Sequence, residues 1–184
     1  MMMDKPAFVI RTAHIDEVPV LENLIPASVR VLSESFYTAA QIEEGINEIF
    51  GVDTQLVLDK TYYVVEVDGH IAACGGWSKR HTTYGADKMK EEQDNLLDPA
   101  KDAARIRAFF VHPDWARRGI GKGLLLRCIT DAKAAGFKEA FLVATLPGEQ
   151  LYKRYGFEVI RRYNHKLSSG LNFPIVDMKK KLSS

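Results

Sequence analysis

The sequence predicts an α/β fold with a mixed, largely antiparallel twisted sheet flanked by helices. Three observations predict it: a hairpin pattern over 61–77, a strand–helix–strand succession over 105–145, and helical patterns in the first fifty residues. With 184 residues, 46% of them hydrophobic, the chain is long enough to bury one core. We therefore expect a single domain spanning residues 1–184.

The N-terminal part carries one short strand pattern and two helical patterns. Residues 8–11 suit a strand, and apolar residues recur at helical spacing over 18–32. Pro26 falls inside that helical pattern, so a kink or two shorter helices is expected there. Thr38 is the predicted N-cap of a second helix over 39–50, which Gly51 ends.

The middle of the chain changes to strand periodicity. Residues 61–67 are aromatic and β-branched, Asp68-Gly69 is a strong hairpin turn signal, and residues 70–77 supply the partner strand. The segment from 79 to 101 is polar and charged, which predicts a long connection containing no more than one helical turn. Connections of this length within a domain are often functional lids or else disordered.

The remaining elements alternate between strand and helix. Residues 105–111 form a strand pattern that His112-Pro113-Asp114 stops, and a glycine-rich turn leads into a helix over 121–135. Residues 139–145 form the next strand, so this unit is predicted to be parallel and right-handed. A short helix over 150–155 and strands over 157–163 and 173–178 complete the prediction.

Composition excludes several classes of function. Lys and Arg total 25 against 24 Asp and Glu, and a net charge of +1 argues against nucleic-acid or anionic membrane binding. Cys74 and Cys128 lie in strand and helix patterns without disulfide or metal-ligand spacing, so buried thiols and no metal site are expected. Since no signal peptide and no run of about eighteen apolar residues occurs, we expect a soluble cytoplasmic protein.

The segment most informative about function is the glycine-rich turn before the helix over 121–135. Glycines allow close approach of a ligand, and free amides at a helix start favour an anion such as pyrophosphate. A nucleotide P-loop is excluded because Gly123, not Ser or Thr, follows Lys122. The dinucleotide fingerprint is excluded because glycines 119, 121 and 123 are two residues apart. Taken alone, the turn is either a phosphate site or only a tight turn.

The pattern Arg-x-x-Gly-x-Gly over 118–123 resembles the signature of the GNAT superfamily of acyl-CoA N-acyltransferases. The preceding strand with its Val111-His112-Pro113 exit is similar to the family's fourth strand. Residues 151–157 resemble its Phe-Tyr-x-x-x-Gly-Phe segment, and residues 176–180 its closing strand. The resemblance covers about 61–182 and implies a sheet splayed near Val111, where the coenzyme inserts.

The resemblance implies an N-acetyltransferase that uses acetyl-CoA and a primary amine, with direct attack of the amine on the thioester. Tyr152 occupies the position of the family's general acid, which protonates the leaving thiolate. The residues implied to bind the donor by main chain, amide or charge are Phe110, Val111, His112, Arg117, Arg118, Gly119, Ile120, Gly121, Lys122 and Gly123. Relatives often dimerise through their last strands, so a homodimer is among the expectations.

The general base does not follow from the resemblance. Many relatives carry a Glu where this chain has Arg105, which cannot accept a proton. Residues of a suitable type elsewhere are His112, Glu66, His81 and Asp59. We expect Arg105 and Arg107 to shape the acceptor pocket, one facing it and one facing away.

The connection over 79–102 enters where relatives assemble the acceptor site. Its acids are either a solvated charge run or an attraction for a cationic amine; they are Asp87, Glu91, Glu92 and Asp94. Trp77, His81 and Tyr84 are candidates for lining the entrance. The acceptor itself is not identified, a longer acyl donor is an alternative, and so is a non-catalytic acyl-CoA sensor of the same fold.

Overall fold

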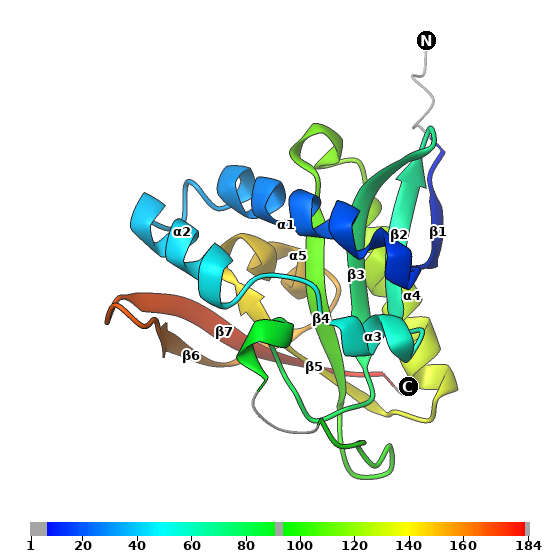
Figure 1. The fold of residues 1–184 in the computed structure, drawn as a ribbon. Helices are drawn as coiled ribbons and strands as arrows, with labels where there is room; N and C mark the ends of the chain where they lie inside the picture. Colours follow the sequence, from blue (N-terminus) through cyan, green and yellow to red (C-terminus); the bar gives the residue numbers. More distant parts are fainter. Residues whose placement is uncertain (1–6, 91–93, 183–184) are drawn as a thin grey trace.

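The fold is built on one seven-stranded sheet (Figure 1). The structure is a computed structural model that describes residues 7–90 and 94–182. The strand order is β1-β2-β3-β4-β5-β7-β6, and β4–β5 is its parallel pair among antiparallel ones. The strands are β1 Val9–Thr12, β2 Tyr62–Val67, β3 His70–Ser78, β4 Ala104–Val111, β5 Glu139–Thr145, β6 Glu158–Lys166 and β7 Asn172–Lys181.

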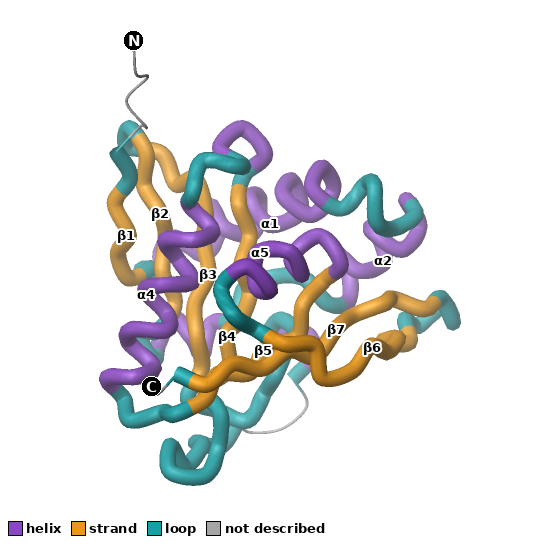
Figure 2. The backbone as a smooth tube through the Cα atoms, turned by 180° about the vertical axis from the view of Figure 1, so that it is seen from behind, coloured by secondary structure: helices purple, strands orange, loops and turns teal. Residues whose placement is uncertain are grey.

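Helices cover both faces of the sheet. They are α1 Val18–Leu32, α2 Ala39–Glu48, α3 Thr54–Leu58, α4 Ile120–Ala134 and α5 Glu149–Arg154. Figure 1 shows α1, α2 and α3 on the near face, and Figure 2 shows α4 and α5 on the opposite one. We call these the α1 face and the α4 face. Each face buries its own apolar cluster, so the molecule has three layers, with the sheet in the middle and helices on either side.

The predicted fold class is confirmed, with two local corrections. Thr38 caps α2 as predicted, because its hydroxyl accepts a hydrogen bond from the Gln41 amide. The expectation of two shorter helices around Pro26 is wrong, since α1 runs unbroken from Val18 to Leu32, and the alternative, a kink, stays a prediction. Leu21, Leu24, Ile25 and Val29 of that helix are buried, and this packing outweighs the lost backbone hydrogen bond.

The other correction is α3, which sequence patterns did not predict. It has five residues, Thr54–Leu58, and is capped by Asp53, whose carboxylate accepts a 3.1 Å hydrogen bond from the Gln55 amide. Over the described residues, no helix has the length and apolar character needed to cross a membrane. Both cysteines are buried and unpaired, as expected.

Candidate active site

The central sheet opens between β4 and β5. The two strands pair over three positions, the last of which joins Ile106 to Leu142. β4 continues to Val111 and β5 to Thr145, and no further pair joins these two strands, both of which are described in full. Backbone groups along the facing edges are therefore free to bind something else, as the predicted splay near Val111 requires.

A β-bulge shapes β4 at this opening. Ala108 and Phe109 together oppose one residue of β3, Gly75. Ala108 has a φ of 55°, and its carbonyl accepts a 2.7 Å hydrogen bond from the hydroxyl of the fully buried Tyr62. Phe109 lies so close over Gly75 that a Cβ there would be 2.6 Å from its ring. The bulge is thus held on the α1 face by the hydroxyl of Tyr62 and on the α4 face by the packing of Phe109 over Gly75.

Beyond the bulge, the main chain of Val111 faces the opening. The amide of the next residue, His112, donates to the carbonyl of Ala72 on β3 at 2.8 Å. Because amides alternate in direction along a strand, the N–H of Val111 points to the other side, toward β5. The ring of Phe110 lies on the α1 face, 6.0 Å from that of Phe50. Donor contacts by Phe110, Val111 and His112 stay a prediction.

The start of α4 offers amides to an anion. The first intrahelical bond joins the Gly123 amide to the Gly119 carbonyl at 3.0 Å, so the amides of residues 120–122 precede it. Arg117 and Gly119 have left-handed φ values of 61° and 82°, which fold the chain back into the helix. The exposed cations are Arg117, Arg118 and Lys122. Backbone dipole and side-chain charge therefore both favour phosphate groups here.

The three glycines of this turn do different things. A Cβ at Gly119 would meet nothing within 4 Å. A Cβ at Gly121 would lie 3.2 Å from Leu151 of α5, and one at Gly123 would lie 3.1 Å from the ring of Phe8. Gly119 therefore serves the turn itself, whereas the other two let α4 pack closely against its neighbours.

Tyr152 lies on α5, at the α4 face beside the opening. Its ring is 6.1 Å from that of Phe109 and 5.9 Å from that of Phe157, and 9% of the residue is exposed. Burial, with a smaller contribution from nearby Cys128, raises the pKa of its phenol far above the ordinary value. A phenol in this environment keeps its proton at neutral pH and can only act as an acid.

These features together fit coenzyme A. The open helix start with its three cations suits the pyrophosphate, and the free edge of β4 suits an extended amide-bearing arm that pairs as a strand would. The ring of Trp115 under Arg118, at 5.0 Å, and that of Tyr155 near Lys122, at 5.9 Å, support two of the cations. When bound, the coenzyme would supply an activated acyl thioester.

Of the base candidates named from residue type, the structure places only His112 at the opening. Its Nδ1 accepts a 3.2 Å hydrogen bond from the Asp114 amide. Glu66 lies on β2 and pairs with Arg11, 3.0 Å away. Asp59 accepts two hydrogen bonds from Arg80, and His81 is exposed in the long connection.

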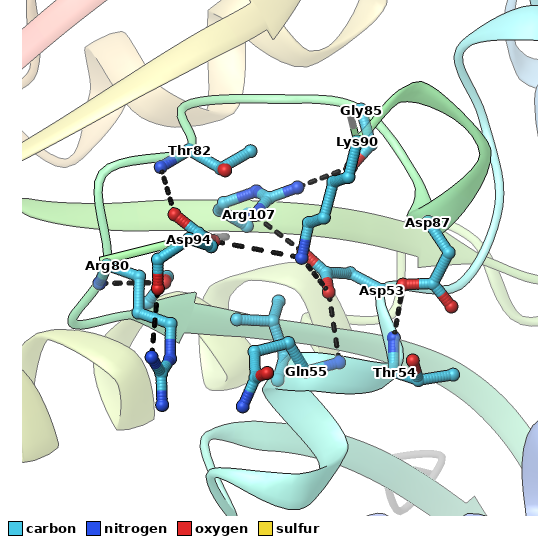
Figure 3. A network of polar contacts seen from close by, with 12 residues as sticks. Asp53, Thr54, Gln55, Arg80, Thr82, Gly85, Asp87, Lys90, Asp94 and Arg107 are labelled. Carbon is cyan, nitrogen blue, oxygen red and sulfur yellow. Dashed lines mark hydrogen bonds and ion pairs between the residues drawn. The ribbon is translucent and has the colours of Figure 1, made fainter. Parts of the chain in front are cut away.

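The long connection is tied to the sheet by buried ion pairs (Figure 3). Asp53, which is fully buried, receives Arg107 Nη1 at 2.7 Å on one oxygen and Lys90 Nζ at 2.6 Å on the other. Lys90 also lies 3.7 Å from Asp94, and Arg80 donates to the Asp94 carbonyl at 2.9 Å. This network fixes the connection on the α1 face.

The loop acids expected to attract an amine are engaged within the protein, where described. Asp87 accepts from the Thr54 amide at 3.0 Å and Asp94 from the Thr82 amide at 2.8 Å. The other two, Glu91 and Glu92, lie outside the described residues. Trp77 is buried on the α4 face, where it donates to Tyr63, so it does not line an entrance on the α1 face.

The expectation that Arg105 and Arg107 face opposite ways is wrong, because residues two apart on a strand share a face. Arg107 is 3% exposed and held by Asp53. Arg105 lies 5.2 Å over the ring of Phe141, with its Nε buried and without a hydrogen-bond partner among the described residues. Arg105 thus has a buried donor left for a ligand, whereas Arg107 is bound to Asp53 and to the Gly85 carbonyl.

Sequence reasoning missed a polar cluster on the α1 face next to the opening. Asp177 of β7 pairs with Arg161 of β6 at 2.7 Å, and the Tyr84 hydroxyl lies 2.8 Å from His165 Nδ1. Tyr163 lies between them along β6. One feature of the sequence could have indicated this cluster: Asp177 is an acidic residue within the otherwise apolar run Ile-Val-x-Met of the last strand.

Comparisons with solved structures show the same architecture. A GCN5-related N-acetyltransferase from Rhodopseudomonas palustris matches with a TM-score of 0.71 and 18% identity, over 98% of each chain. The PaiA N-acetyltransferase from Thermoplasma acidophilum, solved with coenzyme A, matches at 0.63 with 16% identity, over 95% of this chain and 99% of that one. The ribosomal-protein-S18-alanine N-acetyltransferase from Escherichia coli matches at 0.61 with 14% identity, over 97% and 96%.

Identities this low establish the fold alone, and no curated protein matches the chain. The family model described as an acetyltransferase (GNAT) domain matches residues 59–159, which include the hairpin, the opening, the glycine-rich turn and Tyr152. That match covers more than half of the chain, and the protein therefore belongs to the GNAT acetyltransferase family.

Proposed function

We propose that this protein is an N-acetyltransferase that transfers the acetyl group of acetyl-CoA to a primary amine by direct attack. The observation that carries the proposal is the opening between β4 and β5, which leads directly to the anion-binding start of α4. One end can take the phosphates and the other the reacting thioester. Membership of the family supports the same activity.

The donor would be held by groups along one continuous stretch of chain. The main chain of Val111 would pair with the pantetheine arm, and the amides of Ile120, Gly121 and Lys122 would bind phosphate oxygens. Phe110, His112 and the cations Arg117, Arg118 and Lys122 complete this stretch. A backbone donor near Val111 would stabilise the negative charge that develops on the thioester oxygen.

Tyr152 is the proposed general acid. Its hydroxyl gives a proton to sulfur as the carbon–sulfur bond breaks. The attacking nitrogen gives a proton to water and Tyr152 regains one from water, so the products are the amide and the free thiol. Burial raises the pKa of Tyr152, so its phenol still carries the proton when the thiolate forms. Its position beside Phe109, on the bulged part of β4, supports this role.

The test is a thiol-release assay with acetyl-CoA and a panel of primary amines. The panel contains an α-amino acid, a polyamine, an aminoglycoside and a peptide with a free amino terminus. We expect turnover on at least one amine, and a drop of about tenfold or more in Tyr152→Phe without loss of acetyl-CoA affinity. Tyr155→Phe, one helical turn away, is the control and keeps wild-type turnover.

Two other results would redirect the proposal. Tight binding of acetyl-CoA without thiol release on any amine would favour a non-catalytic sensor. Faster release from propionyl- or longer acyl-CoA than from acetyl-CoA would instead change the donor.

A further inference from the structure

We propose that Asp177 binds the amino group of the acceptor, which makes it the acceptor-binding residue of the α1 face. The inference rests on the proposed function and deepens it, because it assigns the second substrate to a side chain. It also names the chemistry recognised: a primary amine that binds in its protonated form and gives one proton to water before its nitrogen attacks the thioester.

Asp177 stands at the row where the sheet begins to open. It pairs with Val143 of β5, the residue directly after Leu142, where the pairing between β4 and β5 ends. Neighbouring strands lie about 4.8 Å apart, so only the width of β5 separates Asp177 from the gap. On the other side of that gap stands the bulge at Ala108.

The side chain of Asp177 projects onto the α1 face. Its neighbours in sequence, Val176 and Met178, belong to the cluster of the α4 face, whereas Ile175 belongs to that of the α1 face. Because side chains alternate along a strand, Asp177 shares the face of Ile175. The proposed donor groups at α4 and Tyr152 lie on the opposite side, so an acceptor on the α1 face would meet the thioester from across the sheet.

One oxygen of this carboxylate is held and the other is not. Oδ2 accepts a 2.7 Å hydrogen bond from Arg161, while Oδ1 is buried and has no hydrogen-bond partner among the described residues. The residue as a whole is 6% exposed. A buried carboxylate oxygen without a donor is costly, and an ammonium group would supply the donor that the described part of the chain does not.

The surroundings of Asp177 suit a cationic amine. Tyr163 and Tyr84 both lie partly buried on the same face. Burial and then the charge of Asp177 raise the pKa of both phenols. Their rings can contact a cation beside the carboxylate. Arg161 is largely exposed, so its charge is screened by solvent while it orients Asp177.

The closing contact of this cluster comes from the long connection. The hydroxyl of Tyr84 lies 2.8 Å from His165 Nδ1 of β6, and the two rings are 5.5 Å apart. Tyr84 therefore bridges from the connection to the strand that also carries Arg161. An amine bound at Asp177 would lie beneath this bridge.

The test compares Asp177→Asn with the wild type for each amine that the wild type acetylates. We expect the KM for the amine to rise at least tenfold, while the KM for acetyl-CoA stays within twofold. Glu139→Gln is the matched control, since it removes a carboxylate that joins β5 to β7 through Lys179 away from the opening. An amine KM within twofold of the wild type in Asp177→Asn would overturn the inference.

Binding measurements separate this inference from the proposed function. Calorimetric titration of the same amines into the coenzyme A complex shows whether Asp177 binds them even if no thiol is released. If the wild type releases no thiol, amine binding that is lost in Asp177→Asn upholds the inference and overturns the proposed catalysis. Binding of no amine by the wild type overturns the inference.

A second variant covers the case in which Asp177→Asn does not fold. Asp177→Glu keeps the charge at the same place, and we expect it to retain amine binding within about tenfold of the wild type. A folded Asp177→Glu protein with normal acetyl-CoA binding and no measurable amine binding would contradict the role assigned to this carboxylate.

Discussion

Two buried aspartates on the same side of the molecule have opposite surroundings. Asp53 receives Arg107 on one oxygen, and Lys90 and the Gln55 amide on the other. Asp177 receives one partly exposed arginine on one oxygen and no donor of the described protein on the other. The first arrangement is complete in itself, as expected of a structural network. The second is incomplete, as expected of a group that binds a ligand.

Breaking the complete network should have the largest effect on stability. Arg107→Gln leaves the buried carboxylate of Asp53 without its strongest partner, so we expect a loss of roughly 3–5 kcal/mol in the free energy of unfolding. Urea denaturation followed by circular dichroism measures it. Arg30→Gln, which removes an exposed pair with Glu43, is the control. Equal, negligible losses in both variants would contradict the structural role of Asp53.

The next largest loss of stability is expected at the carbonyl of Ala108, a neutral group that depends on one donor. Tyr62→Phe removes the hydroxyl that binds the Ala108 carbonyl and leaves that carbonyl without its donor. The expected loss is about 1–3 kcal/mol in the free energy of unfolding, together with slower thiol release, because the bulge at the opening is no longer held. Unchanged stability and unchanged turnover would show that the bulge does not need this bond.

The incomplete site should be the least sensitive in stability. Asp177→Asn removes the charge of a carboxylate whose Oδ1 has no donor, so we expect a change of about 1 kcal/mol or less in the free energy of unfolding. The same urea experiment measures it. A loss as large as that of Arg107→Gln would place Asp177 with the structural network and remove the contrast.

The fold could be predicted from sequence because most elements carry strong local signals. Asp68-Gly69 sets the hairpin, Thr38 sets the start of α2, and the apolar run over 139–145 sets a central strand. The short helix α3 could not be predicted, because its five residues are held by Asp53 and by contacts far along the chain. The continuity of α1 through Pro26 could not be predicted for the same reason, since tertiary packing holds the helix together.

The two sides of the candidate site differ in the same way. The donor side lies on one contiguous stretch, residues 110–123, whose pattern can be recognised in sequence. The proposed acceptor side combines Tyr84, Arg161 and Asp177 from three segments that only the sheet brings together. Arg107 shows the same limit, because its partner Asp53 is 54 residues away and no local pattern joins them.

Because the three glycines of the turn pack differently, a substitution at each of them in a related sequence would have a different meaning. A side chain at position 121 or 123 would signal that α5 or β1 has moved, with no necessary change in ligand affinity. A side chain at position 119 would instead alter the left-handed turn that presents the amides, in a place with room for any substituent. Gly119 is therefore the residue by which a donor-binding relative could be told from one that has kept only the architecture.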